Sequence, residues 1–517
     1  MNARKRTSAS PKPCLDFPGA SAETVRVRVG GVHFAARRGD SPLSMWWHFA
    51  LEGGGDGERQ FIWEHTDEVL GGGGLGRAVP VVRTARGWRR IAAGGCAYDA
   101  AAHRFRFAVP DCGERVEVAY CFPYGLERVD WLLAGLEGRP DVKVRTVGES
   151  AGGRPFRLIE VGHGDAHVWL TARHHAGEVS GGYVLEGLLQ EAVRRPELLA
   201  RVTIHAAPAM DVDGVAEGMY GKDRAPRDFN RDYVAAPCRP EVAALIAAAE
   251  AVGRADVFVD LHAPAPGDGT FVVPIAPTFT TDEEWYEAMG IASSLEAFAP
   301  PTCPCPLTHV SRSSINWYGD LIFQNSTPYF HQRFGALALT LETSYHRAWN
   351  GRLLTPSGWR GLGVALLDAL AVRVGEKAPP AVTQTELPEP LTPRLRDWHG
   401  LSWPSLRLRQ RRSWLEITGP DPASGAVMTR RILPGGDGIA HCAYRLDGAV
   451  GGVQVVIKGM DARSGIPTGE AESVAVELKA GAGWQPLALP HKLGTHLLIF
   501  RLQGLEGTLC LRTGEVC

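Results

Sequence analysis

The chain lacks the features that would assign it to a membrane, a secreted or a nucleic-acid-binding class. No segment approaches the roughly 18 uninterrupted apolar residues that span a bilayer. The basic, polar start at residues 1–11 is not followed by the apolar core of a signal peptide. A net charge of −2 over 517 residues provides no field that would draw the chain to nucleic acid or anionic lipid. We therefore expect neither nucleic acid nor a membrane among its partners.

Cysteine pairs with the CxxC spacing and a phosphate-binding loop are also lacking. The 10 cysteines are scattered, and Cys303 and Cys305 form a close pair without the CxxC spacing of a metal or redox site. This usage is typical of reduced thiols and predicts a cytoplasmic location. The glycine-rich stretch 71–76 lacks the Gly-Lys-Ser/Thr that binds phosphate, so we predict a flexible hairpin tip there.

The length and the changes of pattern along the chain predict three domains, since 517 residues are too many for one core. Residues 1–22 are expected to form a disordered leader, and short alternating strands predict an antiparallel β domain over 23–122. The region 123–378 alternates strands with helices, which predicts an α/β domain with a mixed, mostly parallel sheet and helices on both faces. A proline-rich linker over 379–395 then precedes a C-terminal β-sandwich over 396–517.

The clearest candidate for chemistry is His175-Ala-Gly-Glu178, which directly follows the apolar run 166–172. Two further apolar runs end in Asp260-Leu-His262 and in Thr340-Leu-Glu342. Because side chains at the carboxyl ends of parallel strands gather at one edge of a sheet, we expect these motifs to meet. Two imidazoles and one carboxylate leave a zinc position open for water, and a further carboxylate can act as general base.

A second His-x-x-Glu, His65-Thr-Asp-Glu68, follows no apolar strand, so we expect it on the surface. The loop 218–233 is rich in cations and includes Asn230-Arg231, a pair suited to a carboxylate.

These motifs together resemble the zinc metallocarboxypeptidases of the carboxypeptidase A clan, and within them the cytosolic carboxypeptidase type. The resemblance covers about residues 25–375 and implies that one Zn²⁺ is held by His175, Glu178 and His262, with Glu342 as the general base. It further implies that Asn230 and Arg231 clasp the terminal carboxylate. The expected reaction is hydrolytic release of the C-terminal residue of a peptide or protein. The motifs that carry the resemblance occur in family order: His175 with Glu178, Asp213-Gly214, Asp228-Phe-Asn230-Arg231, Asp260-Leu-His262 and Thr340–Ser344, with Phe122-Pro-Tyr124 before them.

One departure from the family pattern concerns the arginine that polarises the scissile carbonyl, which would fall at Gly221. Lys222 is our expected replacement, with Arg224 as a further substrate-binding candidate. A lysine ammonium is a point charge and positions an oxyanion less rigidly than a guanidinium. Tyr318 is the candidate for the family's substrate-covering tyrosine.

Two other functions stay open at this point. The first is a zinc amidohydrolase or deacylase that acts on a small N-acyl amino acid or a side-chain amide, since related deacylases share the His-x-x-Glu and a later His. The second is a non-catalytic binding protein on the same fold, which the departure at Gly221 leaves possible. An acidic C-terminal residue is one candidate substrate; the side-chain specificity and the oligomeric state stay open.

Overall fold

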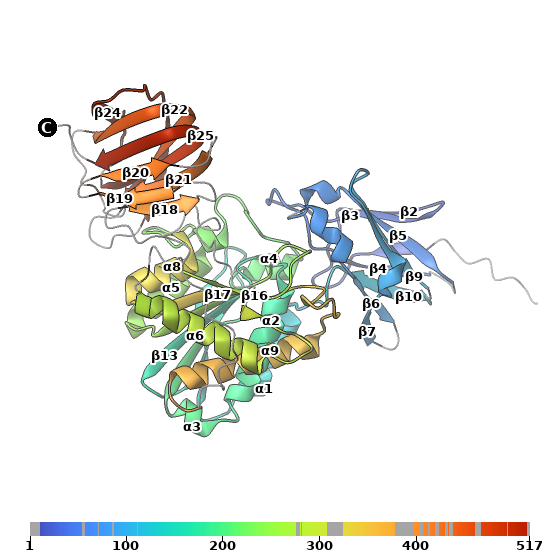
Figure 1. Ribbon diagram of the computed structural model, residues 1–517. Coiled ribbons are helices and arrows are strands. Elements are labelled where there is room, and N and C mark those ends of the chain that lie inside the picture. The colour runs from blue at the N-terminus through green and yellow to red at the C-terminus, as the bar shows by residue number, and fades with distance from the viewer. Residues whose placement is uncertain are drawn as a thin grey trace, which may run out of the picture.

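The computed structural model shows three bodies in chain order (Figure 1). It describes residues 11–513 except for the following stretches: 54–56, 71, 85–86, 111, 276–279, 281, 308–323, 378–397, 403–406, 412–413, 419–422, 430–432, 434–437, 461–466 and 494. The predicted linker 379–395 and Tyr318 therefore lie outside the described residues. Among the described helices, none is both long enough and apolar enough to cross a bilayer.

The N-terminal body is a pair of five-stranded sheets packed over an aromatic core. Within that core the ring of Trp47 stacks on Phe107 with centroids 5.6 Å apart, and Phe61 stacks on the same Phe107 at 5.0 Å. One sheet contains, in spatial order, β1 (Lys12–Cys14), β4 (His48–Glu52), β10 (Arg115–Ala119), β6 (Val81–Thr84) and β7 (Gly87–Arg90). The other contains β2 (Thr24–Arg28), β3 (Gly31–Ala35), β5 (Arg59–Glu64), β9 (Arg104–Val109) and β8 (Cys96–Asp99).

Three details of this body differ from the sequence-based expectation. β3 pairs with β5 in parallel, so the domain is not wholly antiparallel. β1 lies within the predicted leader and pairs with β4, which gives this part of the leader a place in a sheet. The glycine-rich stretch forms the 3₁₀ helix η2 (Gly72–Arg77) instead of a hairpin tip. Gly74 approaches Gly267 of the next domain so closely that an added Cβ would lie 2.5 Å from the Gly267 nitrogen.

The central body is the predicted α/β domain, built on a seven-stranded mixed sheet. Its order is β11 (Val142–Glu149), β12 (Pro155–Gly162), β14 (Val202–Ala207), β13 (Ala166–Ala172), β15 (Val257–His262), β17 (Leu337–Glu342) and β16 (Phe271–Pro274). The four strands β14, β13, β15 and β17 are parallel to their neighbours in this group, whereas β11, β12 and β16 pair antiparallel. Strands β14, β15 and β17 are buried along their whole length and β13 is buried from Val168 onward, as a sheet covered on both faces requires.

Helices cover both faces of this sheet, as predicted. One apolar cluster joins the first face to α1 (Leu126–Leu136), α2 (Val179–Ala192), α6 (Asp282–Phe298) and α9 (Pro356–Arg373). A second cluster joins the other face to α5 (Pro240–Val252) and α8 (Ser326–Phe334). The short helices α3 (Pro196–Leu199), α4 (Val212–Glu217) and η4 (Phe229–Arg231) lie in connections between strands and helices.

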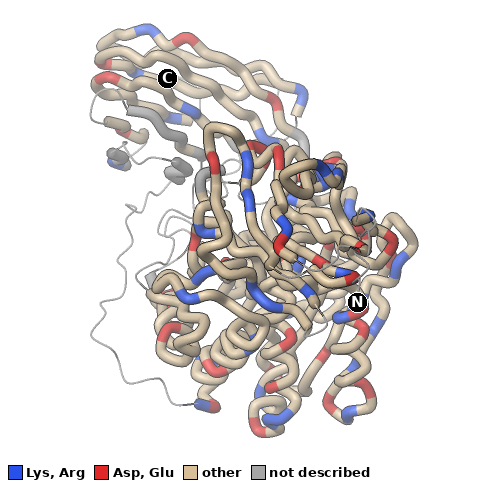
Figure 2. Tube along the Cα trace, turned by 90° about the vertical axis from the view of Figure 1, so that its right-hand side faces the viewer, with Lys and Arg blue, Asp and Glu red and all other residues tan. Residues whose placement is uncertain are grey.

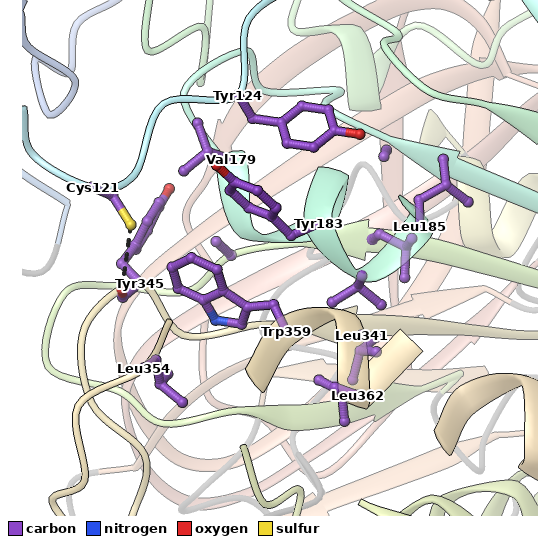
Figure 3. Close-up of a cluster of buried hydrophobic side chains, with 14 of the residues drawn as sticks. Cys121, Tyr124, Val179, Tyr183, Leu185, Leu341, Tyr345, Leu354, Trp359 and Leu362 are labelled. Atoms are coloured by element: carbon purple, nitrogen blue, oxygen red, sulfur yellow. Dashed lines mark hydrogen bonds between the residues drawn. The ribbon is translucent and has the colours of Figure 1, made fainter. Parts of the chain in front are cut away.

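The core under the predicted site is shown in Figure 3. Val179 and Leu341, the chain neighbours of Glu178 and Glu342, point into this core together with Trp359 of α9. The Cys121 thiol donates to the carbonyl of Tyr345 at 3.3 Å, which joins the end of the N-terminal body to the segment after β17. Two of the site's carboxylates therefore stand on a rigid apolar base.

The C-terminal body is one eight-stranded sheet that folds over itself. Its strands are β18 (Trp398–Ser402), β19 (Arg407–Gln410), β20 (Leu415–Thr418), β21 (Ala423–Thr429), β22 (Ile439–Met460), β23 (Pro467–Val476), β24 (Gln485–Pro490) and β25 (His496–Thr513). The long strands β22 and β25 pair with each other along their length and run through both halves of the fold. Near the middle, Gly448 of β22 is the register partner of Gly507 of β25, and both glycines have positive φ. The two halves share one core cluster, so they pack as a sandwich with two strands in common. Basic and acidic residues are interspersed along the chain (Figure 2).

Candidate zinc centre

The turn after β13 places the first two predicted ligands. Arg173 has a left-handed backbone (φ 64°), which ends the strand, and its guanidinium donates to the carbonyls of Ala176 and Tyr124. The amide of Gly177 donates to the carbonyl of Tyr220 at 2.8 Å. These bonds fix the turn, so His175 and Glu178 point to the same side although they lie outside regular structure.

Parallel strands supply the other predicted groups. His262 and Glu342 are the last residues of β15 and β17, and the register pairs them directly across the sheet. The carboxylate of Glu178 lies between the two imidazoles, with Oε1 2.7 Å from Nδ1 of His175 and Oε2 2.7 Å from Nδ1 of His262. All four side chains are buried. The sheet edge thus brings together the residues that the motifs predicted to meet.

The three ligand candidates fit a zinc ion. One atom each of His175, Glu178 and His262 can be chosen so that all three lie within 4.8 Å of one another. Two imidazole nitrogens and one carboxylate oxygen are a donor set that zinc takes in sites with an open position. The remaining ring nitrogens face carboxylates: Nε2 of His262 lies 2.8 Å from Asp260, and Nε2 of His175 lies 3.1 Å from Asp228. Such bonds fix the tautomer that leaves Nδ1 free to bind metal.

A second group, His174 with Asp260 and His262, also satisfies the distance criterion for a metal. Both ring nitrogens of His174 are already engaged, Nδ1 with Asp260 at 2.8 Å and Nε2 with the Tyr233 hydroxyl at 2.6 Å. Asp260 also accepts from Thr171 and Ser326. This group is therefore better suited to supporting His262 than to holding an ion of its own.

The charges of the centre are strongly coupled. Burial alone would lower the pKa of His262, but the carboxylates of Asp260 and Glu178 raise it well above its ordinary value. Burial would raise the pKa of Glu178, yet His175 and Lys222 hold it well below its usual range. Glu178 is therefore an anion that lies between cationic groups. A metal ion that binds here competes with protons for the same ligand atoms.

Glu342 differs from Glu178 in its surroundings. Burial raises the pKa of Glu342 to about 7, although the imidazole of His262 opposes this shift. Its Oε2 is buried without a hydrogen-bond partner in the structure. A carboxylate in this state can accept a proton near neutral pH.

A pocket opens in front of these groups and is lined by three residues that the sequence predicted to act on the substrate: Lys222, Asn230 and Arg231. Lys222 has its ammonium 3.4 Å from Nδ1 of His175 and 3.7 Å from Oε1 of Glu178. The amide of Asn230 is bound by the backbone of Ser326 and lies 3.0 Å from Nε2 of His262. The pocket is lined by His175, Lys222, Asn230, Arg231, His262, Val273, Asn325, Thr340 and Glu342.

One predicted substrate residue among those the structure describes, Arg224, is not brought to this pocket. Arg224 is paired with Asp40 and Asp211 at 2.8 Å each and is not among the described lining residues. Tyr318 lies outside the described residues. The second His-x-x-Glu is remote, because Glu68 pairs instead with Arg38 and Ser44 of the N-terminal body.

Three lining residues had no role assigned to them from the sequence: Val273, Asn325 and Thr340. Thr340 is two residues before Glu342 and points to the same face of β17, so the period of a strand could have indicated it. Val273 is the register partner of Thr340 on β16, and Asn325 precedes α8, so only the tertiary arrangement identifies these two.

The structure also explains the departure at Gly221. This residue has φ 87°, and an added Cβ would lie 2.8 Å from the backbone nitrogen of Ala176. An arginine at position 221 would therefore be strained and would collide with the turn that carries His175. The neighbouring Lys222 instead places its ammonium beside His175 and Glu178.

Comparisons with known proteins agree with this description of the α/β domain. A family model described as zinc carboxypeptidase matches residues 129–262. An uncharacterized protein of Zymomonas mobilis subsp. mobilis is 29% identical over 120 residues, which are 22% of this chain and 32% of that protein. The chain thus matches about a third of the length of this curated relative.

Solved structures extend the similarity in fold beyond the residues that the family model matches. A metallo-carboxypeptidase from Burkholderia cenocepacia has a TM-score of 0.64 at 23% identity, over 71% of this chain and 99% of that one. A metallo-carboxypeptidase from Pseudomonas aeruginosa, in complex with (2-guanidinoethylmercapto)succinic acid, has a TM-score of 0.62 at 22% identity, over 71% and 99% of the two chains. The cytosolic subtype stays a prediction. Residues 129–262 of the α/β domain are thus similar to the zinc carboxypeptidase family, the family that the motifs predicted.

Proposed function

We propose that this chain is a zinc-dependent carboxypeptidase that removes the C-terminal residue of a peptide or protein. The proposal is carried by one pocket, which is lined by the predicted ligands His175 and His262, by the cations Lys222 and Arg231, and by Glu342, a buried carboxylate of raised pKa. When bound by His175, Glu178 and His262, zinc supplies a Lewis acid and lowers the pKa of water.

Glu342 is the proposed general base. Its unpartnered Oε2 takes a proton from the attacking water and passes it to the leaving amine. The pKa of about 7 suits both steps, since the group must accept and then release a proton near neutral pH. Burial also excludes bulk water that would compete for this proton.

Arg231 and Asn230 are proposed to hold the substrate's terminal carboxylate. The Arg231 guanidinium donates from Nη1 to the carbonyl of Asn230 and to Oδ1 of Asn325, and its Nε and Nη2 donors are the ones proposed to bind the ligand. Lys222 is proposed to stabilise the negative charge that develops on the scissile carbonyl oxygen. Lys222 and Arg231 are then both in use. Among the described lining residues, no further Lys or Arg is left to pair with an acidic side chain on the substrate's C-terminal residue. The lining by Val273 and Thr340 favours an uncharged C-terminal residue over an acidic one.

The net charge and the cysteines support the proposed partners and location. A peptide C-terminus is the proposed substrate, and nucleic acid and membrane partners are not expected from the net charge of −2. A cytoplasmic location is supported by the nine described cysteines, which are all free thiols.

The deciding experiment is a peptide library with every C-terminal residue, incubated with the zinc-loaded protein and analysed by mass spectrometry. We expect loss of single C-terminal residues, with uncharged residues released faster than acidic ones. Matched N-acyl amino acids are tested in parallel, because release from these alone would identify a deacylase. Tight zinc binding with no product from either set would favour the non-catalytic binding protein.

A further inference from the structure

The segment that carries Lys222 is held in place by the N-terminal β body. We infer that Asp40 and Ser41, in the connection between β3 and β4, are positioning residues that aim Lys222 into the active-site pocket. This inference rests on the proposed function, in which Lys222 stabilises the oxyanion. It makes the N-terminal body a working part of the active site.

Ser41 holds the backbone of Lys222 itself. Its hydroxyl donates to the carbonyl of Lys222, and the same oxygen accepts the backbone amide of Leu43 at 3.1 Å. Ser41 is buried, with 3% of its surface exposed, so water competes poorly for these bonds. The Cα of Lys222 is thus tied to a residue more than 180 positions earlier in the chain.

Asp40 holds the next turn of the segment. Both its carboxylate oxygens lie 2.8 Å from Nε of Arg224, and its carbonyl accepts the amide of Ala225 at 2.9 Å. Arg224 in turn reaches Asp211 with Nη1 at 2.8 Å. Asp211 caps α4 through the amide of Gly214, so Arg224 links the N-terminal body to the α/β domain.

The start of the segment also touches the N-terminal body. Gly218 has φ 66°, and an added Cβ would lie 2.8 Å from both the carbonyl oxygen of Gly19 and the Cβ of Ser21. Such an approach leaves the segment no room to shift toward that body.

The opposite side of the segment is bonded to the zinc centre. Asp228 accepts the amide of Asp223 at 2.6 Å through Oδ2, and the same carboxylate contacts Nε2 of His175. Lys222 therefore sits between two fixed anchors, one in each body. Its side chain has four carbons and many rotamers, so a fixed backbone is what limits where the ammonium can go.

This arrangement assigns Arg224 a role different from substrate binding. Its guanidinium is paired with the carboxylates of Asp40 and Asp211. Through the first of these pairs, Asp40 fixes the position of the segment that carries Lys222. The charge that looked like a substrate contact in the sequence is a link between two bodies.

The test combines kinetics with a measurement that does not need activity. Asp40→Asn and Ser41→Ala are each made in the natural chain and in a Lys222→Ala background. In the natural chain we expect kcat to fall by about 10- to 100-fold with KM and zinc content unchanged, because misplacing a catalytic group by about 1 Å costs up to this much. In the Lys222→Ala background the same substitutions should change kcat little, since their effect passes through Lys222.

The second measurement is amide hydrogen exchange of residues 219–225, which we expect to be faster in both variants. Asp40→Glu keeps the carboxylate and should recover part of kcat, while Glu64→Gln, which removes an ion pair with His33 in the same body, should match the natural chain. Equal losses of kcat in both backgrounds, or unchanged exchange, would overturn the inference. If the natural chain cleaves no peptide, the proposed function fails, and hydrogen exchange still decides whether Asp40 and Ser41 hold the segment.

Discussion

The carboxylate of Asp228 lies 3.1 Å from Nε2 of His175, whereas Nδ1 of the same ring faces Glu178. Burial would raise the pKa of Asp228, but His175 holds it well below its ordinary range, so Asp228 is an anion. A carboxylate in this position orients the imidazole and strengthens it as a ligand.

We expect Asp228→Asn to weaken zinc binding by about 10- to 100-fold. Groups that hydrogen-bond to the other ring nitrogen of a metal-bound histidine change metal affinity by about this factor. Competition with a zinc chelator measures the change. Asp213→Asn is the control: this carboxylate binds Ser150 and Arg154 and does not line the pocket, so its loss should leave zinc affinity unchanged. An Asp228→Asn variant with natural zinc affinity would argue against this role.

Glu342→Gln should abolish turnover while zinc stays bound. The amide has the shape of the carboxylate but cannot accept the proton, and general-base catalysis contributes roughly 100- to 10,000-fold to the rate. Rate assays and metal analysis on the same preparation separate the two properties. Glu241→Gln changes another buried glutamate outside the pocket and should retain activity. Turnover retained by Glu342→Gln would remove Glu342 from the role of base.

Arg231→Ala should raise KM by about 10- to 100-fold and change kcat much less. A hydrogen bond to a charged group contributes about 1.5 to 3 kcal/mol to binding. Arg231 is proposed to bind the terminal carboxylate equally well in the ground state and in the transition state, so its loss weakens substrate binding without slowing the chemical step. Initial rates against peptide concentration give both constants. Arg227→Ala serves as the control, because Arg227 pairs with Asp232 in the same segment and does not line the pocket. A fall in kcat alone would instead place Arg231 at the reacting carbonyl.

The raised pKa of the Glu241 carboxyl predicts how the stability of the fold depends on pH. Burial raises the pKa of this carboxyl from 4.5 to about 7, so the folded protein binds its proton more tightly than the unfolded chain does. Stability from this group is present below pH 4.5 and is lost as the pH rises through 7. We expect Glu241→Gln to raise the melting temperature at pH 8 by about 2 to 4 °C and to change it little at pH 4.5. An equal shift at both pH values would show that charge is not the cause.

Close helix packing behind the site gives a prediction about stability. In α9, an added Cβ on Gly363 would lie 2.0 Å from the carbonyl oxygen of Val184 in α2, the helix that begins directly after Glu178. We expect Gly363→Ala to destabilise the fold by about 1 to 3 kcal/mol. Gly290→Ala, at an exposed position of α6 with no atom within 4 Å of the new Cβ, should stabilise by about 1 kcal/mol. Denaturant unfolding of the two variants measures the contrast.

Much of the fold could be predicted because the strand pattern is strong. The α/β domain has the expected mixed sheet covered by helices on both faces, and His175, His262 and Glu342 lie near one another at the ends of three of its strands. Buried parallel strands need long apolar runs, and side chains at their carboxyl ends share an edge, so local sequence is enough. Neither the parallel pairing of β3 with β5 nor the long strands shared by both halves of the C-terminal sandwich follows from local pattern.

The sequence by itself determined which residue types could form the centre: two imidazoles, a ligand carboxylate and a separate base, spaced so that strand ends could bring them together. Tertiary structure decided which cation reaches the pocket. Position 221 tolerates only glycine, Lys222 reaches His175, and Arg224 is taken up by Asp40 and Asp211. The physical reason is that the loop's course depends on contacts with the N-terminal body, which lies about 180 positions away in the chain and leaves no trace in the local pattern.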